Sequence, residues 1–455
     1  MTQKRKLTPD TEASNARTCS VIEHLPVELI APDPLNPRKH SREQIRALAR
    51  SIKTFGFNAP ILVDRNGIIK AGHGRLEAAK YLKLSSVPVI RLVHLSEQQA
   101  KAYMLADNKL TDRSTWDDGQ LALRLKELQD IVLDFDIEAT GFEPAEIDFR
   151  IQSLDPPDDA SADDEFEAPE GPAVSHPGDI WQLGPHRLFC GNALEKGSFD
   201  TLLGGERAAA VFADPPYNVR IDGHAVGKGR KRHREFAMAS GEMSRRQFAD
   251  FLHTAIQGMR TFTHNEAVYF MCMDWRHVAE AMSAIDESGC EMINLCVWAK
   301  ANGGMGSLYR SAHELVLVFH ARGTKHLNNV QLGRFGRNRT NVWNYPGMNS
   351  FARRGRARAL DLHPTVKPIA LVADAILDVT RHDDIVLDPF CGSGTTILAA
   401  ERTGRRGYGI ELDPLYVDLT IKRWQQMTKQ FALHEGGKTF AQLCDERKPV
   451  REAAS

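Results

Sequence analysis

The sequence lacks the features of a membrane protein, a disulfide-stabilised secreted protein or a zinc protein. No apolar run in its 455 residues approaches the roughly 20 residues that span a bilayer. Residues 1–20 contain basic side chains but no apolar core typical of a secretory signal. The 7 cysteines are odd in number and form no Cys-x-x-Cys pair, which argues against a disulfide framework and a zinc site. We therefore expect a cytoplasmic protein with no membrane association and no metal.

An excess of one charge is also absent. Lys and Arg number 58 and Asp and Glu number 59, which leaves a formal net charge of −1. Any nucleic-acid binding must therefore come from local basic patches. Hydrophobic residues make up 42% of the chain, enough for a sizeable core, and the length predicts about three domains of ordinary size.

Residues 153–174 are acidic, rich in proline and poor in large apolar side chains, so they cannot bury enough surface to offset their ordering entropy. We interpret them as a linker. The chain then consists of a disordered arm (1–20), an N-terminal module with a helical extension (21–152), the linker, a larger C-terminal module (175–432) and a C-terminal tail (433–455).

The N-terminal module combines helix and strand signals. Ser41 occupies the N-cap position before a helical pattern that reaches Ile52, and Asn66-Gly67 between two apolar runs predicts a hairpin. We expect a small α+β module with strands at 25–30, 61–63, 68–69 and 87–93, a second helix at 76–82, and mostly helix from 96 to 154.

The C-terminal module alternates apolar strands with helices, the pattern of an α/β domain with a mostly parallel sheet. Such a sheet binds ligands at the carboxyl ends of its strands, so polar residues that directly follow a strand are candidates for a site. Strands are expected at 208–213, 267–272, 293–298, 314–319, 385–387 and 407–410, and helices at 246–259, 275–287, 368–379, 395–402 and 415–427.

One candidate is the segment Asp388-Pro-Phe-Cys-Gly-Ser-Gly394, which joins a strand directly to a helix. Its two glycines permit a tight turn and the close approach of a ligand to the backbone. The next strand ends at Glu411, whose carboxylate can hold the two hydroxyls of a ribose. Taken alone, the glycine turn is equally compatible with an ordinary strand-to-helix connection.

The other candidate is Asp214-Pro-Pro-Tyr217, which follows strand 208–213. Two prolines cannot continue a central strand, and they stiffen the loop. The loop places a carboxylate, unpaired carbonyls and an aromatic ring in one small volume. This set can accept both hydrogens of an exocyclic amine and stack on its ring, although a rigid surface turn is the alternative.

Together the two motifs resemble those of amino-group DNA methyltransferases, and their order, with Asp214-Pro-Pro-Tyr217 first, resembles the beta class. His363-Pro-Thr-Val-Lys-Pro368, Cys190-Gly-Asn-Ala193, Trp298-Ala-Lys300 and Tyr309-Arg-Ser-Ala-His-Glu314 extend the resemblance over residues 178–429. The resemblance implies a Rossmann-like domain that transfers a methyl group from S-adenosyl-L-methionine to adenine N6 in double-stranded DNA, an activity typical of restriction-modification.

The resemblance also implies roles for individual residues. Asp214 and the Pro215 carbonyl would accept hydrogen bonds from N6 of a flipped-out base, on which Tyr217 would stack, with Pro216 completing the catalytic loop. The implied cofactor contacts are Lys367 to the carboxylate, Asp388 to the ammonium and Glu411 to the ribose, together with Asn192, Phe390, Gly392, Ser393, Gly394 and Thr395. Asn192 stands where the family usually has aspartate.

Two basic segments lie between the motifs, where this family inserts its target-recognition region, here residues 320–362. Arginine among aromatic residues suits phosphate contact, base readout and filling of the gap left by a flipped base, although a solvated charged loop is the ordinary alternative. The candidate DNA contacts are Arg220, Lys231, Arg232, Arg337, Arg339, Arg353, Arg354 and Arg356.

Residues 21–112 resemble the ParB N-terminal domain, through Pro34-Leu-Asn-Pro-Arg38 and Gly72-His-Gly-Arg-Leu-Glu-Ala-Ala79. In relatives the glycine-arginine segment at a helix start binds nucleotide phosphates, and Gly72, Gly74, Arg75 and Glu77 are the matching positions. Gly74 stands where the family usually has arginine. A domain that only assists DNA docking or oligomerisation, for instance as a homodimer, is the alternative.

Two other functions remain open. The same scaffold could methylate cytosine N4, because both targets are exocyclic amines, although Asp rather than Ser at position 214 favours adenine by association with the family. The other is a DNA-binding partition or regulatory protein with an inactive C-terminal module, against which the intact motifs argue. Methylation at cytosine carbon-5 is not expected, because the catalytic loop holds no Pro-Cys.

Overall fold

The computed structural model describes residues 21–111, 116–129, 131, 133–152, 154, 171–218, 241–300, 308–330, 339–345 and 367–447. The chain divides into two compact units, residues 1–154 and 155–455, and each is described by itself. This division falls inside the predicted linker, most of which lies outside the described residues, so the linker remains a prediction.

The first unit is built on a four-stranded sheet in the order β1-β4-β2-β3. Its strands are β1 (Ile22–Pro26), β2 (Ile61–Val63), β3 (Ile69–Ala71) and β4 (Ser86–Arg91). Antiparallel pairing of β2 with β3 confirms the predicted hairpin. The first strand was predicted at 25–30, which is wrong: β1 ends at Pro26, and Val27–Leu29 form a 3-10 helix.

Helices α1 (Arg42–Phe55) and α2 (His73–Tyr81) pack together beside this sheet. The Ser41 hydroxyl accepts a hydrogen bond from the Gln44 backbone N–H at 3.1 Å, which confirms the predicted N-cap. Ile61, Leu76 and Val89 are fully buried in the small core. The unit continues with α3 (Glu97–Thr111), α4 (Asp118–Gln129) and α5 (Pro144–Gln152).

The second unit contains a ten-stranded sheet in the order β11-β9-β10-β8-β7-β12-β13-β6-β5-β14. The strands are β5 (Ile180–Leu183), β6 (His186–Cys190), β7 (Ala208–Ala213), β8 (Thr263–Met273), β9 (Cys290–Ala299), β10 (His313–Ala321), β11 (Val342–Asn344), β12 (Ile385–Asp388), β13 (Arg406–Glu411) and β14 (Leu433–His434). Its centre, from β8 through β7, β12 and β13 to β6, is parallel, and antiparallel pairs flank it. The predicted α/β class is confirmed, with a mixed sheet.

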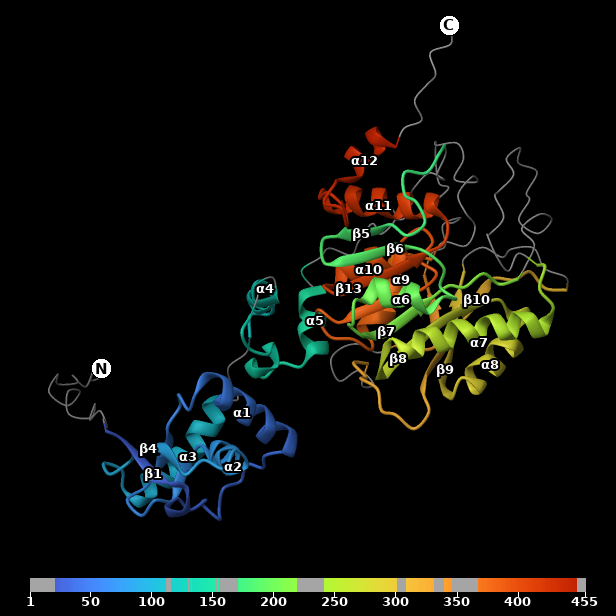
Figure 1. The fold of residues 1–455 in the computed structure, drawn as a ribbon. Coiled ribbons are helices and arrows are strands. Elements are labelled where there is room, and N and C mark those ends of the chain that lie inside the picture. Colours follow the sequence, from blue (N-terminus) through green and yellow to red (C-terminus); the bar gives the residue numbers. More distant parts are fainter. Residues whose placement is uncertain are drawn as a thin grey trace, which may run out of the picture. The chain divides into compact units, whose positions relative to one another are not determined.

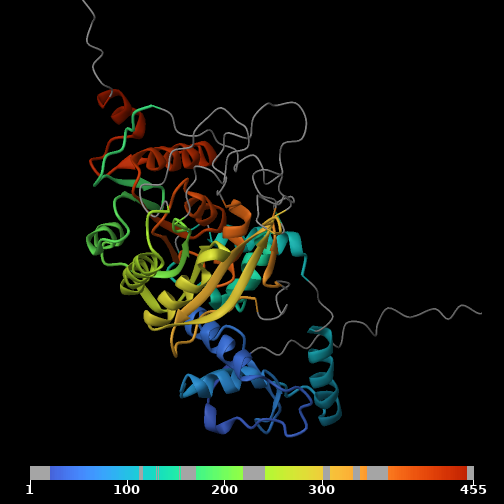
Figure 2. The ribbon, with the colours of Figure 1, turned by 90° about the vertical axis from the view of Figure 1, so that its right-hand side faces the viewer.

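Helices cover both faces of this sheet, which makes three layers (Figures 1 and 2). The green to yellow helices α6 (Lys196–Leu203), α7 (Arg245–Thr261) and α8 (Val278–Glu287) share one core. The orange to red helices α9 (Ile369–Leu377), α10 (Thr395–Thr403) and α11 (Pro414–Thr428) share the other, followed by α12 (Phe440–Glu446). In β7, Phe212 enters one core while Val211 enters the other, as the two-residue period of a strand requires.

Polar contacts tie the parallel strands together at their amino-terminal edge. Arg406 at the start of β13 forms an ion pair with Glu206, just before β7, at 2.8 Å. The Tyr408 hydroxyl donates to the same carboxylate at 2.9 Å. Arg207 donates to the backbone carbonyls of Thr261 and Thr263, at the start of β8. None of the helices in the described residues is long and apolar enough to cross a membrane.

Candidate active site

The two predicted motifs leave the same edge of the large sheet. β7 and β12 are parallel neighbours, with Val211 opposite Leu387, so Asp214, which follows β7, and Asp388, which ends β12, lie at adjacent strand ends. Glu411 ends β13, the next strand along. The antiparallel β10 begins at this edge, which brings Glu314 to it as well, and no periodicity in the sequence indicated that neighbour.

The Asp214 carboxylate is held by two side chains. The Lys367 ammonium lies 2.6 Å from Asp214 Oδ2, and the Tyr217 hydroxyl donates to Oδ1. Lys367 also donates to the Tyr217 oxygen at 3.2 Å, so each of the three side chains contacts the other two. Burial, together with the nearby Asp214 carboxylate, raises the pKa of Tyr217 well above its ordinary value, so the hydroxyl remains a donor at neutral pH.

A second carboxylate lies behind Lys367. Glu314 Oε2 is 3.0 Å from the Lys367 ammonium, and its other oxygen forms an ion pair with Lys300. Burial alone would raise the pKa of Glu314, but the two lysines hold it below its ordinary value. The Lys300 ammonium also lies 4.5 Å from the centre of the Trp298 ring. The sequence singled out both segments without assigning them a role.

The contacts of Lys367 differ from those expected of a partner for the cofactor carboxylate, which was its predicted role. Its side chain is 4% exposed and lies between two carboxylates. Burial would lower the pKa of Lys367, but Asp214 and Glu314 raise it above its ordinary value, so the ammonium is permanently charged. Its counter-charges come from the protein itself, and the geometry favours a role in holding Asp214.

Two carboxylates accept hydrogen bonds from the backbone of the glycine turn after β12. Asp388 accepts from the Phe390 N–H at 3.0 Å and from the Thr396 hydroxyl at 2.6 Å. Glu411 accepts from the Gly392 N–H at 2.7 Å, so the turn is tied to the end of β13. Burial raises the pKa of both Asp388 and Glu411 to about 7, which makes an approaching cation or hydroxyl donor favourable for either.

Helix α11 braces this turn from behind, a contact that sequence reasoning missed. Thr420 donates to the Gly392 carbonyl at 3.1 Å, and the buried Arg423 donates to the Ser393 carbonyl at 2.7 Å. Gly394 has φ +83° and is the N-cap residue of α10, which begins at Thr395. A Cβ at Gly394 would overlap the Thr420 side chain, so this glycine is needed both for its backbone conformation and for space.

The other predicted cofactor positions flank the turn. Asn192 follows β6, accepts from the Leu194 N–H at 3.0 Å and donates to Glu195 at 3.2 Å, so it organises the start of the next segment. The Phe390 ring lies 6.0 Å from that of Phe251. Among the described residues, no group of three or more His, Cys, Asp or Glu side chains is placed to hold a metal ion.

The predicted DNA contacts can be assessed at one position. Arg220, Lys231, Arg232, Arg337, Arg353, Arg354 and Arg356 lie outside the described residues. Arg339, with a side chain only 17% exposed, forms ion pairs with Asp374 and Asp378, each at 2.8 Å. Its guanidinium also lies 5.5 Å from the Trp343 ring. Two carboxylates and an aromatic face occupy Arg339, so it ties its segment to α9, and its prediction as a DNA contact is not supported.

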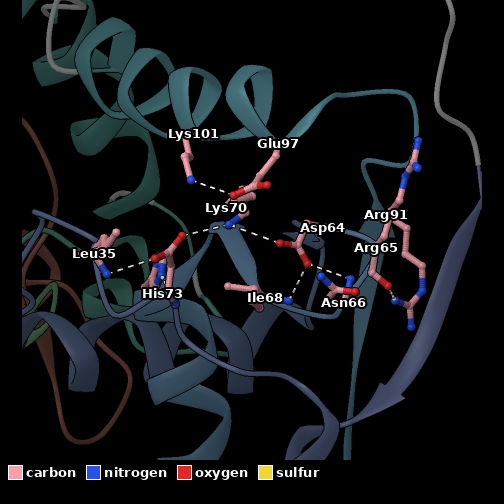
Figure 3. A network of polar contacts seen from close by, with 11 residues as sticks. Leu35, Asp64, Arg65, Asn66, Ile68, Lys70, His73, Arg91, Glu97 and Lys101 are labelled. Atoms are coloured by element: carbon pink, nitrogen blue, oxygen red, sulfur yellow. Dashed lines mark hydrogen bonds and ion pairs between the residues drawn. The ribbon is translucent and has the colours of Figure 1, made fainter.

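In the first unit, a buried lysine organises the loops around the predicted nucleotide site. Lys70 points between two carboxylates, Asp33 at 2.8 Å and Asp64 at 3.3 Å (Figure 3). Asp64 also accepts the Ile68 N–H, and Asp33 accepts the Leu35 N–H. These contacts fix the hairpin and the segment before α1 around one ammonium.

The four predicted nucleotide-binding positions are not all brought together. Gly72 has φ +103° and precedes α2, and the Arg75 guanidinium folds over it and donates to the Ala59 carbonyl at 3.0 Å. Gly74 instead packs against α1, where a Cβ would lie 3.0 Å from the Leu48 side chain. Glu77 forms an exposed ion pair with Lys80 at 2.9 Å. Only Gly72 and Arg75 therefore share the turn.

Comparison with known proteins assigns families to both units. Residues 208–422 match the DNA methylase family, residues 10–109 the ParB N-terminal domain, and residues 119–177 the ParB-methyltransferase HTH domain. The last match spans the whole of the predicted linker, 153–174. The chain is 47% identical over 78 residues to the ParB-like nuclease domain-containing protein YnaK of Escherichia coli (strain K12), which covers 17% of this chain and 90% of YnaK.

The chain is also 26% identical over 233 residues to the type II methyltransferase M2.MboI of Moraxella bovis, covering 48% of this chain and 81% of that protein. Similar solved structures include the putative DNA modification methylase TTHA0409 of Thermus thermophilus in complex with S-adenosyl-L-methionine (21% identity, TM-score 0.39, 55% of this chain, 96% of that one). Another is the cytosine-N4-specific PvuII DNA methyltransferase (17% identity, TM-score 0.41, 57% and 89%).

The methylase match lies in the second unit and the ParB N-terminal match in the first, and the matched methylase region contains Asp214, Glu314, Asp388 and Glu411. Residues 208–422 therefore belong to the DNA methylase family, in a chain that also carries a ParB N-terminal domain.

Proposed function

We propose that the chain transfers a methyl group from S-adenosyl-L-methionine to the N6 amino group of a flipped-out adenine at a specific site in double-stranded DNA. The observation that carries this proposal is the position of Asp214 and Asp388 after adjacent parallel strands. A base held at the first loop and a cofactor held at the second would meet at one sheet edge.

At the base, Asp214 and the Pro215 carbonyl act as hydrogen-bond acceptors. The lone pair of an adenine amine is delocalised into the ring, and two acceptors on its hydrogens favour the tetrahedral nitrogen that must attack. Lys367 and the Tyr217 hydroxyl hold the carboxylate in position, and the Tyr217 ring lies beside it to stack on the base. Pro216 keeps the loop rigid.

At the cofactor, this chain supplies buried oxygen acceptors. Asp388 accepts the ammonium and Glu411 the ribose hydroxyls, while the turn at Gly392 and Gly394 lets the ligand approach the backbone. Bound S-adenosyl-L-methionine would supply an activated methyl group to this edge. Asn192, Phe390, Ser393 and Thr395 line the same turn in this proposal.

Methylation of cytosine N4 is the second candidate, because its amine makes the same demands on the loop. Adenine is proposed because position 214 holds aspartate, where cytosine-N4 enzymes more often have serine. We also propose that DNA is contacted by the basic side chains Arg220, Lys231, Arg232, Arg337, Arg353, Arg354 and Arg356. Nucleotide binding at Gly72 and Arg75, and a homodimer, are proposals for the ParB-like domain.

The test is transfer of tritium from labelled cofactor to DNA, followed by identification of the modified base in DNA from cells that express the protein. Asp214→Ala should abolish transfer while cofactor binding, measured by calorimetry, is retained. Glu206→Gln is the control, because Glu206 pairs with Arg406 at the amino-terminal edge of the sheet, at the other end of β7 from Asp214. Transfer by Asp214→Ala would exclude the proposed mechanism, and N4-methylcytosine in the product would establish the second candidate.

A separate titration addresses the ParB-like domain. Full-length protein is titrated with CTP and with ATP, and Arg75→Ala serves as the comparison. Binding that this substitution removes supports a nucleotide site at the α2 turn. No binding to the wild-type protein leaves DNA docking or oligomerisation as the role of the domain.

A further inference from the structure

The side chains behind Asp214 form a row of alternating charges. Asp214 contacts Lys367 at 2.6 Å, Lys367 contacts Glu314 at 3.0 Å, and Glu314 contacts Lys300. Their side chains are 26%, 4%, 11% and 23% exposed in that order, so the row is most buried at Lys367 and Glu314 and partly exposed at both ends. Two negative and two positive groups make it neutral as a whole, which buried charges require.

The surroundings of Lys367 explain why one carboxylate is not enough to position it. Lysine has a flexible four-carbon stem and three N–H donors. Three oxygen acceptors surround its ammonium: Asp214 Oδ2, the Tyr217 hydroxyl at 3.2 Å and Glu314 Oε2. The first two belong to the catalytic loop itself. Glu314, on β10, is the acceptor that connects Lys367 to the rigid sheet.

Glu314 is in turn fixed by its other neighbour. Lys300, at the end of β9, pairs with its second oxygen and lies over the Trp298 ring. Trp298 is 2% exposed and donates to the Tyr345 carbonyl at 3.0 Å. Lys300 therefore rests on a buried aromatic ring at its end of the row, and each charged group in the row has partners on two sides.

We propose that Glu314 is a positioning residue for methyl transfer, which holds Lys367, and through it the Asp214 carboxylate, at the place where the base amine must bind. Lys300 secures Glu314 in this role. The inference rests on the proposed function, because it assigns Asp214 to the base. Glu314 itself does not touch the base or the cofactor.

A substitution at Glu314 should therefore slow methyl transfer without weakening cofactor binding. Replacement of Glu314 by glutamine removes one counter-charge from Lys367 and lets its stem adopt other rotamers. A small displacement of a reacting group can slow an enzyme by up to about 100-fold. The carboxylates at the glycine turn are held by backbone N–H groups of the turn itself, Asp388 by Phe390 and Glu411 by Gly392, so cofactor affinity should change little.

A double-mutant cycle tests the proposal with the full-length protein. Single-turnover methyl transfer is measured for wild type, Glu314→Gln, Lys367→Met and the double variant. Groups that act as one unit are not additive, so the double variant should be no slower than Lys367→Met alone. Rate reductions that multiply in the double variant would overturn the positioning role.

Two further measurements separate positioning from mere folding. Cofactor Kd and the unfolding temperature are recorded for each variant, and a loss of rate matched by an equal loss of cofactor affinity would contradict the proposal. Glu206→Gln is the control, because its carboxylate is also held by an ion pair and a hydroxyl donor but lies at the opposite edge of the sheet, and it should leave the rate unchanged. If Glu314→Gln does not fold, Glu314→Gln/Lys300→Met carries the same comparison without a net change of charge.

The outcomes also separate this proposal from the proposed function. If the wild-type chain transfers no methyl group to DNA, the proposed function fails. If wild type is active and the two rate reductions multiply, only the role of Glu314 fails.

Discussion

The two buried carboxylates at the glycine turn should make cofactor binding sensitive to pH. Burial raises the pKa of Asp388 and of Glu411 to about 7, so near neutral pH each is only partly ionised in the free protein. An ammonium needs the ionised form of Asp388. Binding should therefore weaken as the pH falls below about 7, because the ligand must then displace a proton.

The magnitude follows from the ionised fraction. Well below pH 7, each further unit of pH reduces that fraction about tenfold, so Kd rises about tenfold if Asp388 alone must ionise. If Glu411 must ionise as well, the rise is about 100-fold per unit. Asp388→Asn should remove a factor of about ten per pH unit, and Glu411→Gln should remove any excess over tenfold.

Calorimetric titration with the cofactor between pH 5.5 and pH 7 measures this, in buffers of different ionisation enthalpy so that proton release is counted directly. The range stays below the pKa of an α-amino group, about 7.7 to 8.0, so the ligand keeps its charge. A Kd that is constant across the range, with no proton released, would refute the reasoning. The same pKa values predict that the ligand-free protein loses stability as the pH rises from about 4 towards about 7, because over that range the unfolded chain releases both protons more readily than the folded one.

Other expected outcomes concern residues outside the catalytic loop. Arg339→Ala removes the buried guanidinium that pairs with Asp374 and Asp378, so urea denaturation should show a destabilisation of about 3–5 kcal/mol, while the salt dependence of DNA binding stays unchanged. Neutralising Arg353 and Arg354 should instead reduce that salt slope by about 1 for each phosphate that the variant no longer binds; an unchanged slope would remove them from the interface. Gly394→Ala should cost about 1–3 kcal/mol in unfolding free energy and weaken cofactor binding, with partial recovery in Gly394→Ala/Thr420→Ser, since serine keeps the hydroxyl and lacks the overlapping methyl group.

Elements with a strong period were predictable from the sequence. β7 coincides with its predicted range, 208–213, because six small or apolar residues end at a proline pair that no central strand can include. The helix at 395–402 was found for a related reason, since glycines mark its start. β5 and β6 were not predicted: they are four and five residues long and mix polar with apolar side chains, so neither shows a clear pattern.

The site was predictable only as far as each motif follows its own strand. The sequence placed Asp214 and Asp388 after strands, and the order of the sheet made those strands neighbours. The partners of Lys367 could not be predicted, because Asp214 is 153 residues away and an ammonium in a motif does not reveal which carboxylate it meets. The ion pairs of Arg339 could not be predicted for a similar reason, since Asp374 and Asp378 are not adjacent to it in sequence.

Polar contacts stabilise the sheet at the edge opposite the catalytic loop and the glycine turn. They are the ion pair of Glu206 with Arg406 and the hydrogen bonds of Arg207 next to the start of β8. The stability of the sheet and the choice of DNA target can therefore change separately. The segments that follow β7 and β10 could be exchanged for those of a relative with another target without breaking any of these contacts. Conversely, additional ion pairs at the amino-terminal edge should raise the unfolding temperature without changing the choice of substrate.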